Sequence, residues 1–176
     1  MKAAAADPQK EAGMQVFCAH RMLAVAVLVL AAALFAIVRP AVAQEIRTYS
    51  KKADYDDVRF DLTNAIINRG LVIDHNGKIG EMLERTGRDV GSDKPIYKAA
   101  EFFTFCSAKL SRQMMEADAR NIAFCPYVMF IYESVGEPGV VVVGYRRPSA
   151  SGSPETKAAL AEIDSLLDGI AREATQ

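Results

Sequence analysis

Residues 102–132 read FFTFCSAKLSRQMMEADARNIAFCPYVMFIY, and this stretch decides the fold. An aromatic run ends at Cys106, a segment with helical spacing follows, and Cys125 begins a second apolar run. We expect a strand before Cys106, a helix from Ser107 to about Ile122, and a strand after Cys125. The first strand is too apolar to leave one face in water, so we place it centrally in a sheet. The stretch therefore predicts a strand–helix–strand unit at the core of one domain.

Strands and helices alternate on both sides of this unit. Asp54 begins a helix that ends before Gly70, and Ser153 with Pro154 begins a last amphipathic helix. Residues 74–77 (DHNG) have the composition of a turn. The expected strands are 46–51, 71–73, 97–105, 127–132 and 140–143. The order β-α-β-α-β-α-β-β-α predicts an α/β fold of the α+β type: a two-layer sandwich with a mixed, largely antiparallel sheet of about five strands and helices mostly on one face.

The first 43 residues have the pattern of a secretory signal peptide. The run from Met22 to Val38 carries no charge, Arg21 precedes it, and small residues end at Ala43. We therefore predict cleavage after Ala43 and a periplasmic protein. The alternative is an uncleaved anchor in the inner membrane, because the apolar run is close to the ~17 residues of the shortest membrane-spanning helices.

Length and charge limit the classes of function. The chain has 176 residues and a formal net charge of −1. We predict one α/β domain over residues 44–148, then a linker and an amphipathic helix over 149–176. A mildly acidic chain without a basic cluster argues against nucleic-acid binding. Contact with a membrane is expected only through the N-terminal segment.

Three short motifs are similar to those of a known family. They are FCS at 105–107, CPY at 125–127 and YRRP at 145–148. With the sequence around them, from about residue 49 to 148, the chain resembles the domain of unknown function 302 family. The resemblance implies a compact α/β fold with a largely antiparallel sheet, secreted bacterial relatives and a homodimer. It implies no activity.

Cys106 and Cys125 are the two cysteines of the predicted mature chain, and they are candidate reactive thiols. An exported chain with two cysteines invites a disulfide. A straight helix over 107–122 would be about 24 Å long at ~1.5 Å per residue, whereas a disulfide needs Cα atoms within roughly 7 Å. This geometry favours two separate thiols at opposite ends of the sheet. A helix that breaks near Asp118, with the chain doubling back, would let them meet.

Cys106 itself has two interpretations. It precedes the N-terminus of the expected helix, where the helix dipole lowers the pKa of a thiol and favours a reactive thiolate. The alternative, which we favour, is a buried cysteine that packs as a small hydrophobic side chain.

The sequence assigns no metal, cofactor or catalytic residue. His75 is the one histidine of the predicted mature chain, and it shares no motif spacing with Cys106 or Cys125. A catalytic zinc site usually takes three protein ligands. The chain has no G-x-S-x-G motif, phosphate-binding loop or dinucleotide fingerprint. An enzyme is therefore not the favoured interpretation.

The end of the last predicted strand carries two adjacent arginines. Arg146 and Arg147 are candidate anion-binding residues, because paired guanidinium groups can hold an anion. The simpler alternative is a solvated strand end. Earlier in the chain, Tyr127, Phe130 and Tyr132 are expected to pack in the core.

These features predict an exported bacterial α/β domain that binds a small ligand or a protein partner, as a homodimer. The alternative function is a thiol-dependent redox or metal-handling protein that uses Cys106 and Cys125.

Overall fold

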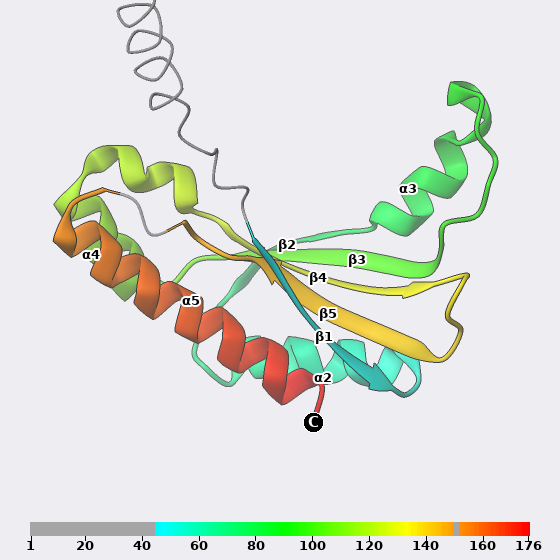
Figure 1. Cartoon of the computed structure of the whole chain (residues 1–176), viewed down its shortest axis with the longest axis horizontal. Helices are drawn as coiled ribbons and strands as arrows, with labels where there is room; N and C mark the ends of the chain where they lie inside the picture. Colours follow the sequence, from blue (N-terminus) through cyan, green and yellow to red (C-terminus); the bar gives the residue numbers. More distant parts are fainter. Residues whose placement is uncertain (1–44, 150–151) are drawn as a thin grey trace, which may run out of the picture. The chain divides into compact units, whose positions relative to one another are not determined.

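The computed structural model describes residues 45–149 and 152–176, which belong to one compact unit, residues 44–176. Figure 1 shows its elements along the chain. They are β1 (Ile46–Lys52), α2 (Tyr55–Ile67), β2 (Ile73–Gly77), α3 (Ile79–Thr86), the 3-10 helix η1 (Arg88–Val90), β3 (Tyr97–Phe105), α4 (Ala108–Ala117), the 3-10 helix η2 (Ala119–Phe124), β4 (Tyr127–Ser134), β5 (Val140–Arg146) and α5 (Pro154–Ala174).

The predicted signal peptide, including the run from Met22 to Val38, lies outside the described residues. Export and the alternative membrane anchor therefore stay predictions. Within residues 45–149 and 152–176, no helix combines the length and the hydropathy that crossing a membrane requires.

The five strands form one sheet in the order β1-β5-β4-β3-β2, and every neighbouring pair is antiparallel. β3 has a strand on each side, as its apolar sequence predicted, and β1 and β2 are the two edges. The predicted α+β sandwich is confirmed. The described strands contain no parallel pair, so the sheet is wholly antiparallel there rather than mixed.

Helices α2, α4 and α5 cover one face of the sheet and enclose the core. Alternate residues of the central strands, such as Met129 and Ile131 of β4 and Val143 of β5, point toward these helices and are fully buried. Tyr127 shares this face, whereas Phe130 and Tyr132 follow the opposite alternation. The prediction that all three aromatic residues pack in the core is therefore correct only for Tyr127.

The last helix, α5, packs on its own domain. Ser153 caps it by accepting a hydrogen bond from the backbone N–H of Thr156, at 3.2 Å, and Pro154 occupies its first turn. The apolar stripe faces the core with Leu160 and Ile163 buried. Figure 1 shows α4 beside the start of α5 and α2 beside its end.

Helix α4 is shorter than predicted, because it ends at Ala117. Asp118 has an extended backbone, with φ −159° and ψ 121°, and its side chain caps η2. The Asn121 side chain donates to the Met114 carbonyl at 2.8 Å and to Thr156 Oγ1 at 3.0 Å. Short polar side chains such as these bond to backbone groups that would otherwise pair within the helix. The prediction that this helix extends to residue 122 is therefore wrong.

β2 begins where the sequence predicted that a strand would end. The predicted turn at 74–77 is wrong, because Asn76 and Gly77 pair with Phe103 and Phe102 of β3. β2 is an edge strand with exposed polar side chains, and the pairing with β3 outweighs the weak strand propensity of DHNG.

The second face of the sheet is only partly covered. α3 packs on β3 at Ala100, so closely that a Cβ atom at Gly80 would lie 3.0 Å from the Ala100 nitrogen. The other end of this face, near the start of β4 and the end of β5, carries Val128 and Phe130. We call this second face the open face.

Candidate functional site

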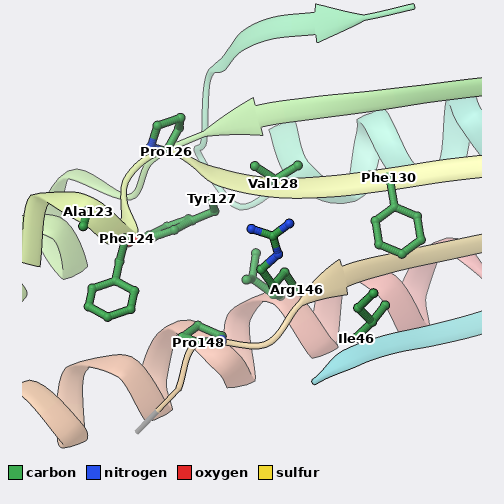
Figure 2. Close-up of a pocket in the computed structure, with 10 residues that line it drawn as sticks. Ile46, Ala123, Phe124, Pro126, Tyr127, Val128, Phe130, Arg146 and Pro148 are labelled. Atoms are coloured by element: carbon green, nitrogen blue, oxygen red, sulfur yellow. The ribbon is translucent and has the colours of Figure 1, made fainter. Parts of the chain in front are cut away.

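The sheet opens between β4 and β5 at one end. The ladder between these strands stops at the pair Met129 and Tyr145. Beyond it, β4 continues beside β3 to Tyr127, whereas β5 continues beside β1 to Arg146. The two strands therefore separate, and Figure 2 shows the gap that they leave, seen from the open face.

This gap is a pocket of about 370 Å³, within the ~300–1,000 Å³ range of small-molecule sites. Among the described residues, the lining is formed by Ile46, Ala123, Phe124, Pro126, Tyr127, Val128, Phe130, Arg146, Pro148 and Leu167. Arg146 is the one charged side chain of this set, and the rest are apolar or aromatic. The pocket thus offers an apolar surface with a single positive charge.

Two prolines stand where the strands separate. Pro126 immediately precedes β4, and Pro148 follows β5 by two residues. Proline has no N–H group, so neither residue can donate a ladder hydrogen bond across the gap. The two prolines therefore fit the separation of the strands. They are the feature of the sequence that points to the pocket, and a prediction of strands alone does not use it.

Arg146 points into the gap. Figure 2 shows its guanidinium between β4 and β5, close to Val128 and on the same side of the sheet as Phe130. Within the described residues Arg146 makes no ion pair and no hydrogen bond through its side chain, unlike its neighbour Arg147. Its donors therefore remain available to a ligand.

Arg147 has a different role. Adjacent strand residues face opposite sides of a sheet, and Arg147 turns toward α5. Its Nε donates to Asp164 Oδ2 at 2.9 Å, and its Nη1 lies 3.0 Å from Glu45 Oε2. The structure therefore does not bring Arg146 and Arg147 together as the paired anion site that the sequence suggested, and only Arg146 lies in the pocket.

Cys106 and Cys125 form a disulfide, with Cα atoms 6.1 Å apart. The prediction of two separate thiols is wrong, because α4 ends at Ala117 and η2 returns the chain to the end of β3. This is the break near Asp118 that the sequence left open. Since both sulfur atoms are bonded, neither residue is a free thiol, and the thiol-dependent alternative is not favoured.

The disulfide is next to the pocket. Cys125 stands between Phe124 and Pro126, which both line it. Ser111 Oγ lies 3.6 Å from Cys125 Sγ and 3.4 Å from the Tyr127 hydroxyl oxygen. The bond therefore fixes the wall that η2 and the start of β4 provide.

His75 lies on the edge strand β2, with its ring centroid 5.8 Å from that of Phe102. It is not grouped with the cysteines. Within the part of the chain that the structure describes, no three His, Cys, Asp or Glu side chains are placed to hold a metal ion.

A polar cluster around Asp168 ties α5 to β1. Asp168 accepts hydrogen bonds from the Tyr49 hydroxyl, from Arg47 Nη1 at 3.3 Å and from Arg172 Nε at 2.7 Å. Burial by itself raises the pKa of Asp168, but these hydrogen bonds and the nearby guanidinium groups outweigh it and hold the pKa at about 2. The carboxylate is satisfied by the protein, so we assign this cluster to docking of the helix.

A second polar cluster surrounds the buried carboxylate of Glu101 on β3. Glu101 is 6% exposed and accepts hydrogen bonds from Asn76 at 2.7 Å, Arg59 at 2.9 Å and Lys78 at 3.1 Å. Burial raises its pKa, but these donors outweigh burial and lower it overall. The hydroxyl of Tyr55 is buried, and none of the residues that the structure describes forms a hydrogen bond with it. Burial, followed by the charge of Glu101, raises its pKa.

Glu101→Gln is expected to lower the free energy of unfolding by about 2 kcal/mol at pH 7, because hydrogen bonds to a charged group contribute ~1.5–3 kcal/mol. The pKa of Glu101 is lower in the folded chain than in the unfolded chain. Its contribution is therefore complete above the unfolded pKa of ~4.3 and is lost as the pH falls through the folded value. Urea unfolding between pH 7 and pH 3 should show the difference from wild type shrinking toward acid.

The matched control for this experiment is Glu116→Gln. Glu116 pairs with Arg112 on the exposed side of α4, where an ion pair contributes ~0–1 kcal/mol. A difference between wild type and Glu101→Gln that stays constant from pH 7 to pH 3 would contradict the lowered pKa.

The fold and pocket define an antiparallel α+β sandwich whose sheet opens at one end to form a ligand-sized cavity. The sequence model of the domain of unknown function DUF302 matches residues 46–174. The chain therefore belongs to the DUF302 family, which confirms the resemblance of its motifs.

One solved structure with this fold is the crystal structure of an uncharacterized conserved DUF302 protein from Bacillus stearothermophilus. It matches with a TM-score of 0.62 and 15% sequence identity, over 75% of this chain and 99% of that chain. At this identity the likeness supports the fold alone. No curated protein matches the chain significantly.

Proposed function

We propose that this protein binds a small organic anion with an apolar body in the pocket between β4 and β5. The observation that carries the proposal is Arg146, a guanidinium without a protein partner among the described residues, in a pocket whose other lining is apolar or aromatic. A carboxylate or sulfonate would take two parallel hydrogen bonds from such a group.

The surroundings of Arg146 favour an amphiphilic ligand over a simple inorganic ion. Burial of apolar ligand surface contributes about 25 cal/mol per Å², and the pocket offers Phe124, Val128 and Leu167 for that purpose. Arg146 is exposed, so water and salt screen its charge and contact with the apolar lining adds to the affinity. An ion without an apolar part would gain only the contact with Arg146.

The disulfide supports this proposal in two ways. A bonded wall needs less ordering when a ligand binds, which favours affinity. A disulfide is also typical of exported proteins, in agreement with the predicted periplasmic location. That location and the homodimer stay predictions from the sequence.

The probe for the test is 1-anilinonaphthalene-8-sulfonate, an amphiphilic anion that fluoresces in apolar sites. Wild-type protein should bind it saturably, and Arg146→Gln should weaken the affinity about tenfold or more, because a charge-assisted hydrogen bond contributes ~1.5–3 kcal/mol. The readout is a fluorescence titration at low salt and at physiological salt.

The matched control is Arg88→Gln, which removes the same charge from an exposed position on η1. It should leave the affinity within about twofold of wild type, since a distant surface charge acts only through the screened field. Equal affinities for wild type, Arg146→Gln and Arg88→Gln would overturn the proposal, as would the absence of saturable binding.

A further inference from the structure

The ring of Phe130, which lines the same pocket as Arg146, lies flat on the sheet. Phe130 of β4 stands opposite Gly144 of β5, and a Cβ atom at Gly144 would lie only 2.5 Å from Phe130 Cζ. Because Gly144 has no side chain, the ring of Phe130 can lie over β5. Figure 2 shows this ring nearly face-on from the open face, between its own strand and Ile46.

Further aromatic side chains support the ring from one side. The rings of Phe130 and Tyr132 are almost parallel, at 19°, with centroids 6.2 Å apart. Tyr97 then packs against Tyr132 at 5.4 Å. This aromatic row leads along β4 away from Arg146, so Phe130 is its last member and borders the pocket.

The arrangement suits a flat ligand better than a chain. Aromatic pairs in offset or edge-to-face contact gain affinity beyond the area that they bury, by about two- to tenfold. A planar ring placed on Phe130 would direct an acidic substituent into the gap where the Arg146 guanidinium lies. A saturated ligand would pack on the ring of Phe130 without this additional aromatic–aromatic gain.

We propose that the ligand of this pocket is a planar aromatic acid, whose ring stacks on Phe130 while its carboxylate pairs with Arg146. This inference rests on the proposed function, because it names the ligand class of the same site. It assigns specificity to Phe130 and charge recognition to Arg146.

The test compares 2-naphthoate with decahydro-2-naphthoate, as competitors of the fluorescent sulfonate. The two acids share their carbon skeleton and their carboxylate, and only the first is flat and aromatic. Hydrophobicity alone favours the saturated acid, which has more C–H surface. Wild type should nevertheless bind 2-naphthoate more tightly, by up to about fivefold, because the gain from one stacking contact exceeds this hydrophobic difference.

Phe130→Leu should remove this preference while retaining saturable binding of both acids. Phe60→Leu is the matched control, because Phe60 is 65% exposed on α2, and it should leave the preference intact. Arg146→Gln should weaken both acids to the same extent. Circular dichroism of each variant checks that the fold is retained.

The outcomes separate the two proposals. Equal or reversed affinity for the two acids in wild type, with loss of both on Arg146→Gln, would overturn the aromatic ligand class and leave the anion-binding function standing. A preference that survives Phe130→Leu would overturn the role of Phe130. Absence of Arg146-dependent binding for either acid would overturn both proposals.

Discussion

The double substitution Cys106→Ser/Cys125→Ser is expected to lower the free energy of unfolding by about 3 kcal/mol. The disulfide joins residues that are 19 positions apart, and closing a loop of this size removes chain entropy from the unfolded state worth roughly 3 kcal/mol. The loss should appear in urea unfolding of the non-reduced protein.

Reduction provides the control for this prediction. Dithiothreitol should bring wild type to the stability of the double variant and leave the double variant unchanged. A free-thiol assay under denaturing, non-reducing conditions should find no thiol in residues 44–176. The disulfide would be contradicted if the assay found two free thiols in residues 44–176, or if dithiothreitol left the stability of wild type unchanged.

The sequence predicted correctly those elements in which capping residues, proline position and apolar pattern all indicate the same structure. The last helix has its cap at Ser153, proline in its first turn and an apolar stripe through Ile163, and all three features reappear in the structure. β3 spans the predicted residues 97–105, because its apolar end, FFTF at 102–105, favours an interior strand.

The failures lie where tertiary pairing competes with local preference. Residues 74–77 have the composition of a turn, yet they belong to β2 because His75, Asn76 and Gly77 pair with β3. The helical spacing after Cys106 continues past Asp118, but the helix stops there because Asp118 caps η2. Because α4 ends at Ala117, the chain turns back and Cys125 comes close enough to Cys106 to form a disulfide.

The candidate site was only partly visible in the sequence. Arg146 could be selected as a strand-end cation, and the alternation of a strand could already have separated it from Arg147. The pocket depends on where the β4–β5 ladder ends, which follows from the pairing register of the folded sheet. Pro126 and Pro148 are consistent with that end point, but the sequence does not show that they face each other.

Ile163→Ala is expected to lower the free energy of unfolding by about 3 kcal/mol. Ile163 is fully buried in the core between α5 and the sheet, and Ile-to-Ala changes in cores cost ~2–5 kcal/mol through lost transfer energy and the cavity that remains. Alanine has the higher helix propensity, so the helix itself is not weakened. The effect would therefore report on packing alone.

Ser165→Ala is the control on the same helix. Its hydroxyl is exposed and donates to the Ala161 carbonyl at 3.0 Å, so the change should stay within about 0.5 kcal/mol. The same unfolding curves test where the helix docks. Because α5 packs on its own domain, Ile163→Ala should leave the dependence of the urea midpoint on protein concentration the same as in wild type. A midpoint that rises with wild-type concentration and loses this dependence in Ile163→Ala would mean that the stripe docks on a second chain.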